Sequence, residues 1–137
     1  MTCDHQTTIA SQCIRVLLVD DHERIRQALK TLLVAYDNLE VIGEAENGED
    51  AITMANVLQP AVIVMDINMP KMDGIEATAR IKSQIPSVSI IGISVTGGIH
   101  ECTMIKAGAT AFLTKASAVE SLYETIMKAV KSDNQCT

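Results

Sequence analysis

The sequence has very few aromatic residues and no excess of basic ones. Aromatic side chains make up 2% of the 137 residues, so a platform that stacks nucleic-acid bases is not expected. The formal net charge is −6, which argues against binding to a phosphate backbone as the main task. An acidic surface instead favours small cations or basic partner proteins.

Signals for secretion, membrane insertion and paired-cysteine metal sites are also missing. No Lys or Arg precedes Arg15, and no apolar run approaches the length of a membrane span, so neither a signal peptide nor a membrane segment is expected. The cysteines are scattered and show no metal-binding spacing. They are interpreted as reduced thiols of a cytoplasmic protein: Cys3, Cys13, Cys102 and Cys136.

What is present is a globular pattern of alternating strands and helices. A hydrophobic content of 47% in 137 residues is enough for one domain with its own core. The domain is expected over residues 14–131, between a tail at 1–13 and a tail at 132–137. Short apolar runs predict five strands, at 14–19, 39–45, 62–65, 88–93 and 110–113.

Helices are expected after each strand, because apolar residues recur there at helical spacing. The side chains expected to face the core include Ile25, Ala28, Leu29, Leu32 and Leu33 in the first helix, Ile99, Cys102 and Ile105 in the fourth, and Val119, Leu122, Ile126 and Val130 in the fifth. Five alternations of strand and helix predict a parallel sheet with helices on both faces. Two glutamates in the second strand suggest that it lies at an edge.

Polar residues close four of the five expected strands. Asp20 and Asp21 follow the first strand, Asp66 the third, Ser94 the fourth and Lys115 the fifth. In a parallel sheet the carboxyl ends of the strands lie along one edge, where α/β proteins bind their ligands. We therefore expect these five side chains to converge. The alternative is that they are only helix caps and surface ion pairs.

The residue types in this cluster suit phosphoryl chemistry. Three neighbouring carboxylates repel one another, which raises their pKa values unless a cation compensates. Mg²⁺ prefers oxygen ligands and would do so. Asp66 would attack a phosphorus atom and form an acyl phosphate. Lys115 and the metal would neutralise the phosphoryl oxygens, and the Ser94 hydroxyl would donate to one of them.

The sequence resembles the receiver domain of two-component response regulators. The resemblance covers residues 14 to about 131 and rests on motifs at 16–22, 65–74 and 106–115, together with Ser94. In the residues of these motifs, the sequence is most similar to the branch whose members usually carry a helix-turn-helix output domain. No such domain follows the last expected helix in this sequence, so DNA binding is not expected of this chain.

The resemblance implies a flavodoxin-like (CheY-like) five-stranded parallel sheet of order 2-1-3-4-5. It also implies that Asp66 is phosphorylated by a histidine kinase or a phosphotransfer protein. Asp21 and Asp66 would bind Mg²⁺ directly, Asp20 mainly through water, and Asn68 through its backbone carbonyl. Lys115 would hold the phosphoryl group together with the serine hydroxyl.

A switch is implied as well. Ser94 and Phe112 would form the switch pair, with the hydroxyl moving toward the phosphate and the ring rotating inward. The face built by the fourth helix, fifth strand and fifth helix would then change its affinity for an effector protein or a second copy. Phe112 stands where Tyr is frequent, and simple core filling is its alternative role. Asn68 and Thr96 would tune dephosphorylation.

Two other classes remain as alternatives. A phosphohydrolase of the haloacid-dehalogenase type also uses an aspartyl phosphate, but it needs a second Asp two positions after the nucleophile, where this chain has Asn68. A receiver-shaped binding module that is never phosphorylated would tend to lose part of the polar set, which is intact here. The preferred interpretation is therefore a phosphoacceptor signalling domain rather than an enzyme with turnover.

Overall fold

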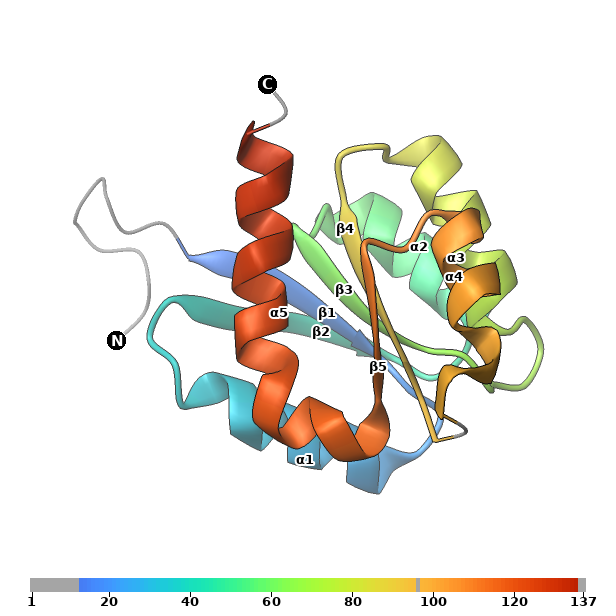
Figure 1. Cartoon of the computed structure of the whole chain (residues 1–137). Coiled ribbons are helices and arrows are strands. Elements are labelled where there is room, and N and C mark those ends of the chain that lie inside the picture. The colour runs from blue at the N-terminus through green and yellow to red at the C-terminus, as the bar shows by residue number, and fades with distance from the viewer. Residues whose placement is uncertain (1–12, 96, 136–137) are drawn as a thin grey trace.

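The computed structural model describes residues 13–95 and 97–135, with only the backbone described for 97 and 132–135. Strands and helices alternate along the chain (Figure 1). The elements are β1 (Ile14–Val19), α1 (Glu23–Val34), β2 (Leu39–Ala45), α2 (Gly48–Leu58), β3 (Val62–Asp66), α3 (Gly74–Gln84), β4 (Ser89–Ser94), a short 3₁₀ helix η1 (Gly97–His100), α4 (Glu101–Ala107), β5 (Ala111–Thr114) and α5 (Lys115–Gln135).

The sheet has the expected topology. Its five strands are parallel and run in the order β2-β1-β3-β4-β5, which places β2 at an edge. The fourth and fifth strands each begin and end one residue later than expected, so that Ser94 is the last residue of β4. The central strand β3 is buried along its whole length, as its continuous apolar run predicts.

The core consists of two apolar layers, one on each face of the sheet. Alternate residues of β1 point to opposite faces, so Val16 and Leu18 belong to one layer while Leu17 and Val19 belong to the other. Helices α1 and α5 cover the first layer, and α2, α3 and α4 cover the second (Figure 1). This sandwich of two helical layers around a sheet leaves the rim at the carboxyl ends of the strands open for a site.

Several side chains expected to face the core do not. Ile99, Cys102 and Ile105 are exposed, and Met104 is the buried residue of α4. The apolar spacing was misleading because Ile99 lies in η1, whose turn differs from that of an α-helix, and because α4 has only 7 residues. Met104 fills the space above Gly92 of β4, where a Cβ would lie 2.7 Å from Cε of Met104.

Two further expectations about helical faces are wrong. Val119 of α5 is 64% exposed. Ala28 of α1 is exposed as well, since the buried positions of that helix are Arg26, Leu29 and Leu33. The remaining inward positions named for α1 and α5 are buried or partly buried. The inward stripe of α1 is thus displaced toward an arginine that hydropathy would place outside.

The ends of the chain are only partly described. The expected tail at 1–13 lies outside the described residues except for Cys13, and α5 continues to Gln135 rather than ending before 132. The expectation of a reduced thiol is wrong for Cys13, which is disulfide-bonded. Cys102 is free and exposed, while Cys3 and Cys136 fall outside the described part. Among the described residues, no helix combines the length and hydropathy that crossing a membrane requires.

Candidate phosphoacceptor and metal site

Strand register brings the polar ends of four neighbouring strands together. Val19 of β1 pairs with Met65 of β3, so Asp20 and Asp66 follow side by side. Asp66 in turn pairs with Ile93 of β4, the residue before Ser94. Ser94 pairs with Thr114, and Lys115 comes next. The convergence at one rim that the sequence predicts is therefore present in the backbone.

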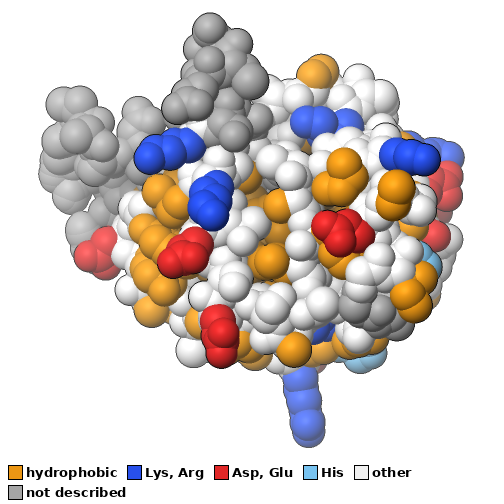
Figure 2. Space-filling model, in the orientation of Figure 1, with side chains coloured by type: hydrophobic (Ala, Val, Ile, Leu, Met, Phe, Trp, Pro, Cys, Tyr) orange, Lys and Arg blue, Asp and Glu red, His pale blue; other side chains and the backbone are white. Residues whose placement is uncertain are grey.

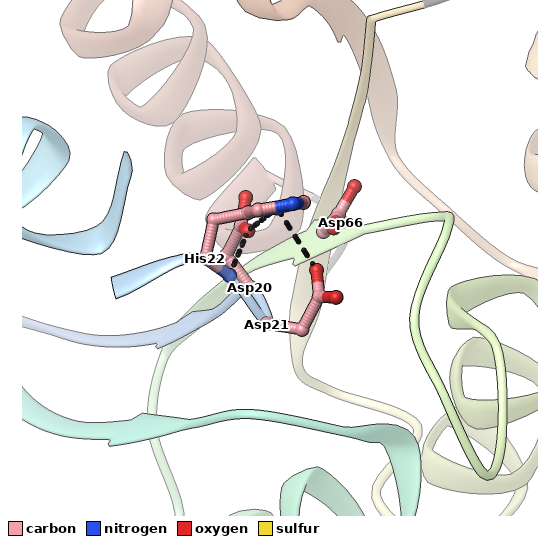
Figure 3. Close-up of side chains that lie close together, drawn as sticks. All are labelled: Asp20, Asp21, His22 and Asp66. Carbon is pink, nitrogen blue, oxygen red and sulfur yellow. Dashed lines mark hydrogen bonds and ion pairs between the residues drawn. The ribbon is translucent and has the colours of Figure 1, made fainter. Parts of the chain in front are cut away.

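The side chains meet at this rim (Figure 3). Asp20, Asp21, His22 and Asp66 each offer a ligand atom, and these atoms lie within 4.8 Å of one another. Asp20 and Asp66 are each only 1% exposed. The ammonium of Lys115 lies 2.8 Å from Oδ2 of Asp20 and 3.4 Å from Oδ1 of Asp66. One partly buried lysine thus bridges two buried carboxylates.

The cluster has more negative than positive charge. Burial, followed by the negative charge of Asp20, raises the pKa of Asp66 to about 6, although Lys115 acts in the opposite direction. The expected rise in pKa is thereby confirmed for Asp66. One cationic side chain does not offset the desolvation and the mutual repulsion of the acids, so the site favours a further positive charge.

The donor set fits a divalent cation. Within the described part of the chain, no hydrogen-bond donor reaches Oδ2 of Asp66, although this oxygen is buried. A buried carboxylate oxygen without a partner is costly, and a hard cation with oxygen ligands would relieve that cost. Asp20, Asp21 and Asp66 supply such oxygens from two adjacent strand ends. The residues therefore fit the magnesium ion that the sequence implies.

The loop after β3 holds Asp66 in place by close backbone contacts. The amide of Gly74 donates to the carbonyl of Ile67 at 2.9 Å. A Cβ on Gly74 would lie only 2.1 Å from the backbone oxygen of Asp66, so this position requires glycine. Asp73 caps α3 by accepting from the amide of Glu76 at 2.9 Å. The loop therefore returns directly beneath the acidic residue it follows.

The other residues named from sequence lie in different surroundings. Asn68 is exposed in the loop two residues after Asp66, and Thr96 lies outside the described residues. Phe112 is partly buried on β5, with Cδ1 3.2 Å from the point that a Cβ on Gly92 would occupy. Phe112 therefore packs on the β4–α4 side of the sheet, and its role in switching stays a prediction.

One buried cation beside the site was not found from sequence. Arg26 of α1 donates to the backbone carbonyl of Asp20 at 2.7 Å and to Glu44 of β2 at 2.9 Å. The guanidinium and the nearby Lys30 lower the pKa of Glu44. Arg26 thereby fixes the backbone between Asp20 and Asp21. The sequence did contain a signal for this contact. It was a basic residue at helical spacing from the apolar face of the first helix, together with an acidic residue in the expected edge strand.

A five-stranded parallel sheet of this order, with an acidic cluster and a lysine at its carboxyl rim, defines a CheY-like receiver fold. Residues 16–127 match the family model of the response regulator receiver domain, so the chain belongs to this family. It resembles the solved response regulator domain of CheB from Thermotoga maritima, with a TM-score of 0.80 and 30% identity over 88% of this chain and 98% of that one.

The curated relatives include bacterial response regulators. Response regulator GacA of Pseudomonas protegens is 35% identical over 82% of this chain and 54% of its own length. Transcriptional regulatory protein LiaR of Bacillus subtilis is 40% identical over 88% of this chain and 57% of its own length. The chain therefore spans about half the length of these relatives. The resemblance in sequence covers their receiver portion.

Proposed function

We propose that Asp66 accepts a phosphoryl group and that the resulting aspartyl phosphate switches the domain in a two-component phosphorelay. The observation that carries this proposal is the placement of Lys115 between Asp20 and Asp66, at 2.8 and 3.4 Å, in a rim where three acidic side chains outnumber this one lysine. With a pKa of about 6, Asp66 is mostly in its nucleophilic carboxylate form at neutral pH.

Each residue of the rim has a part in this transfer. A carboxylate oxygen of Asp66 forms the new bond to phosphorus, while the bond from phosphorus to the donor breaks and its electron pair leaves with the donor. Lys115 neutralises a phosphoryl oxygen, and the hydroxyl of Ser94 donates to another. Asp20 and Asp21, with Asp66 and the carbonyl of Asn68, would hold Mg²⁺. The bound ion supplies charge stabilisation for the transferred group.

The proposed consequence is a change on the face formed by α4, β5 and α5. These three elements adjoin one another on the side shown in Figure 2, where hydrophobic side chains alternate with charges of both signs. Ile105 of α4 and Val119 of α5 are among the exposed apolar residues. Ser94 and Phe112 would transmit the change by moving together, which shifts the population between two packings.

The partners follow from this function. The phosphoryl donor is a histidine kinase or a phosphotransfer protein, and the receiver of the signal is an effector protein or a second copy of the domain. We assign the chain to the cytoplasm, and we assign it no turnover of a separate substrate. Its charge of −6 does not favour direct DNA binding. In longer relatives, output of that kind would belong to the residues outside the matched half.

The proposal is tested by intact mass after incubation with Mg²⁺ and acetyl phosphate. The mass of the wild-type chain should rise by one phosphoryl group, and a chelator should prevent the rise. Asp66→Asn should abolish it. Asp73→Asn is the matched control, because asparagine also caps helices and the exposed Asp73 lies in the same loop. An unchanged gain in Asp66→Asn would remove Asp66 as the acceptor.

A further inference from the structure

His22 lies at the mouth of the acidic cluster without any role assigned to it so far. Its side chain is 62% exposed, whereas that of Asp20 is 1% exposed. The imidazole extends over the acidic residues, and its Nδ1 lies 3.3 Å from Oδ1 of Asp20 and 3.1 Å from Oδ1 of Asp21 (Figure 3). The position of the residue is fixed by its own amide, which donates to Oδ1 of Asp20 at 2.8 Å.

These spacings are those of ligands around one metal ion. Adjacent ligands of an octahedral ion with bonds of about 2.0–2.1 Å lie about 3.0 Å apart, and those of a tetrahedral ion about 3.3 Å. The distances from Nδ1 to the two carboxylate oxygens, 3.1 and 3.3 Å, are polar contacts in the structure and lie close to such edges. The imidazole therefore needs no large movement to join Asp20 and Asp21 on a cation.

The two oxygens of Asp20 face different cations. Oδ2 pairs with Lys115 at 2.8 Å, while Oδ1 faces His22. The lysine therefore does not fill the space between the imidazole and the acids. The buried Oδ2 of Asp66, which no donor reaches among the described residues, is an independent sign that this space accepts a cation. The ligand oxygen of Asp66 lies within 4.8 Å of the ligand nitrogen of His22, in the same cluster of four side chains.

We propose that Nδ1 of His22 binds directly to the metal ion of this site and makes it a mixed nitrogen and oxygen site. Carboxylate and carbonyl oxygens suit Mg²⁺ and Mn²⁺, whereas an imidazole nitrogen adds affinity for ions such as Ni²⁺ and Zn²⁺. His22 is thus a specificity-determining residue for the metal. This inference rests on the metal site of the proposed function, but it does not depend on phosphorylation.

The test compares Ni²⁺ and Mg²⁺ binding by calorimetry for the full chain and for His22→Ala. We expect the variant to bind Ni²⁺ about tenfold more weakly or worse, a loss of about 1.4 kcal/mol or more, while Mg²⁺ affinity changes little. Excess Mg²⁺ should displace Ni²⁺ from the wild type, which locates both ions at one site. His100→Ala is the matched control, since His100 lies in η1 outside the cluster and should leave both affinities unchanged.

A spectroscopic measurement keeps the test independent of affinity. Mn²⁺ bound to the wild type should show electron spin-echo modulation from an imidazole nitrogen, and His22→Ala should lose it. The variant is expected to fold, because the His22 side chain makes no capping hydrogen bond to α1. Persistent modulation in the variant, equal losses for both ions, or a gain for both ions would overturn the inference.

The same titrations separate this inference from the proposed function. If the wild type binds Mg²⁺ and gains a phosphoryl group while Ni²⁺ affinity is independent of His22, only the role of His22 is wrong. If no divalent ion binds to the wild type, the metal site itself fails, and both proposals fail with it. A gain in affinity for both ions would identify the imidazole as a competitor that occupies the site.

Discussion

Replacing Asp66 by asparagine should stabilise the folded protein. The pKa of this buried carboxyl rises from 3.8 to about 6, and each pKa unit corresponds to about 1.4 kcal/mol, so the ionised form costs about 3 kcal/mol at neutral pH. Asparagine has nearly the same shape and no charge. Because Lys115 loses one of its two partners, we expect a net gain of about 1–3 kcal/mol, or about 3–9 °C in the melting temperature.

The pH dependence has a definite sign. The carboxyl of Asp66 titrates near 3.8 in the unfolded chain and near 6 in the folded one. Between these values the folded state binds more protons, so the wild type loses stability as the pH rises through this window. Below it, Asp66 is protonated in both states and no penalty remains. The advantage of Asp66→Asn should therefore grow from about pH 4 to about pH 7 and then stay constant.

Urea unfolding in the presence of a chelator measures this difference at each pH. Other ionisable groups affect both proteins and largely cancel in the comparison, and Asp73→Asn serves as the exposed control. Added Mg²⁺ should then stabilise the wild type more than Asp66→Asn, since only the folded wild type has the full ligand set. A variant that is less stable than the wild type at pH 7, or a difference that does not vary with pH, would refute the reasoning.

Two further substitutions test the surroundings of the site. Gly74→Ala would place a Cβ 2.1 Å from a backbone oxygen, so thermal unfolding should show a loss of about 1–3 kcal/mol or more; Gly98→Ala, with its nearest atom at 3.6 Å, should change stability by less than about 0.5 kcal/mol. Arg26→Gln should cost about 1–3 kcal/mol at neutral pH, because the carbonyl of Asp20 and the carboxylate of Glu44 lose a charged donor. That cost should shrink in acid, because Arg26 is the main cause of the low pKa of Glu44 and protonation of Glu44 removes the charge that Arg26 stabilises; a pH-independent loss would contradict this role.

The site could be predicted from the sequence because its residues lie at the carboxyl ends of the strands. Once the runs at 14–19, 62–65 and 110–113 are identified as parallel strands, topology alone places Asp20, Asp66 and Lys115 at one edge of the sheet. No knowledge of side-chain conformation is needed for that step. The distances that decide the chemistry, such as 2.8 Å from Lys115 to Asp20, depend on rotamers and could not be obtained in this way.

The helical faces were less predictable because hydropathy does not specify what a side chain contacts. Arg26 is buried since its guanidinium meets a carbonyl and a carboxylate, and no apolar periodicity reports such partners. Ile105 fits the apolar spacing of the fourth helix, but Met104 enters the core instead, because Gly92 leaves room above β4. His22 was similarly visible in the sequence, but only coordinates place its ring nitrogen beside two carboxylates.

Lys115 provides a physical route from charge at the rim to movement of α5. It is the first residue of that helix, and its ammonium is closer to Asp20 than to Asp66, at 2.8 against 3.4 Å. A phosphoryl group on Asp66 would add negative charge on the more distant side and draw the ammonium toward it. Thr114 and Ser117 are joined by hydrogen bonds of 3.0 Å at this helix start. A shift of Lys115 that extends to its backbone would move the β5–α5 junction, and with it the face that we propose for partner binding.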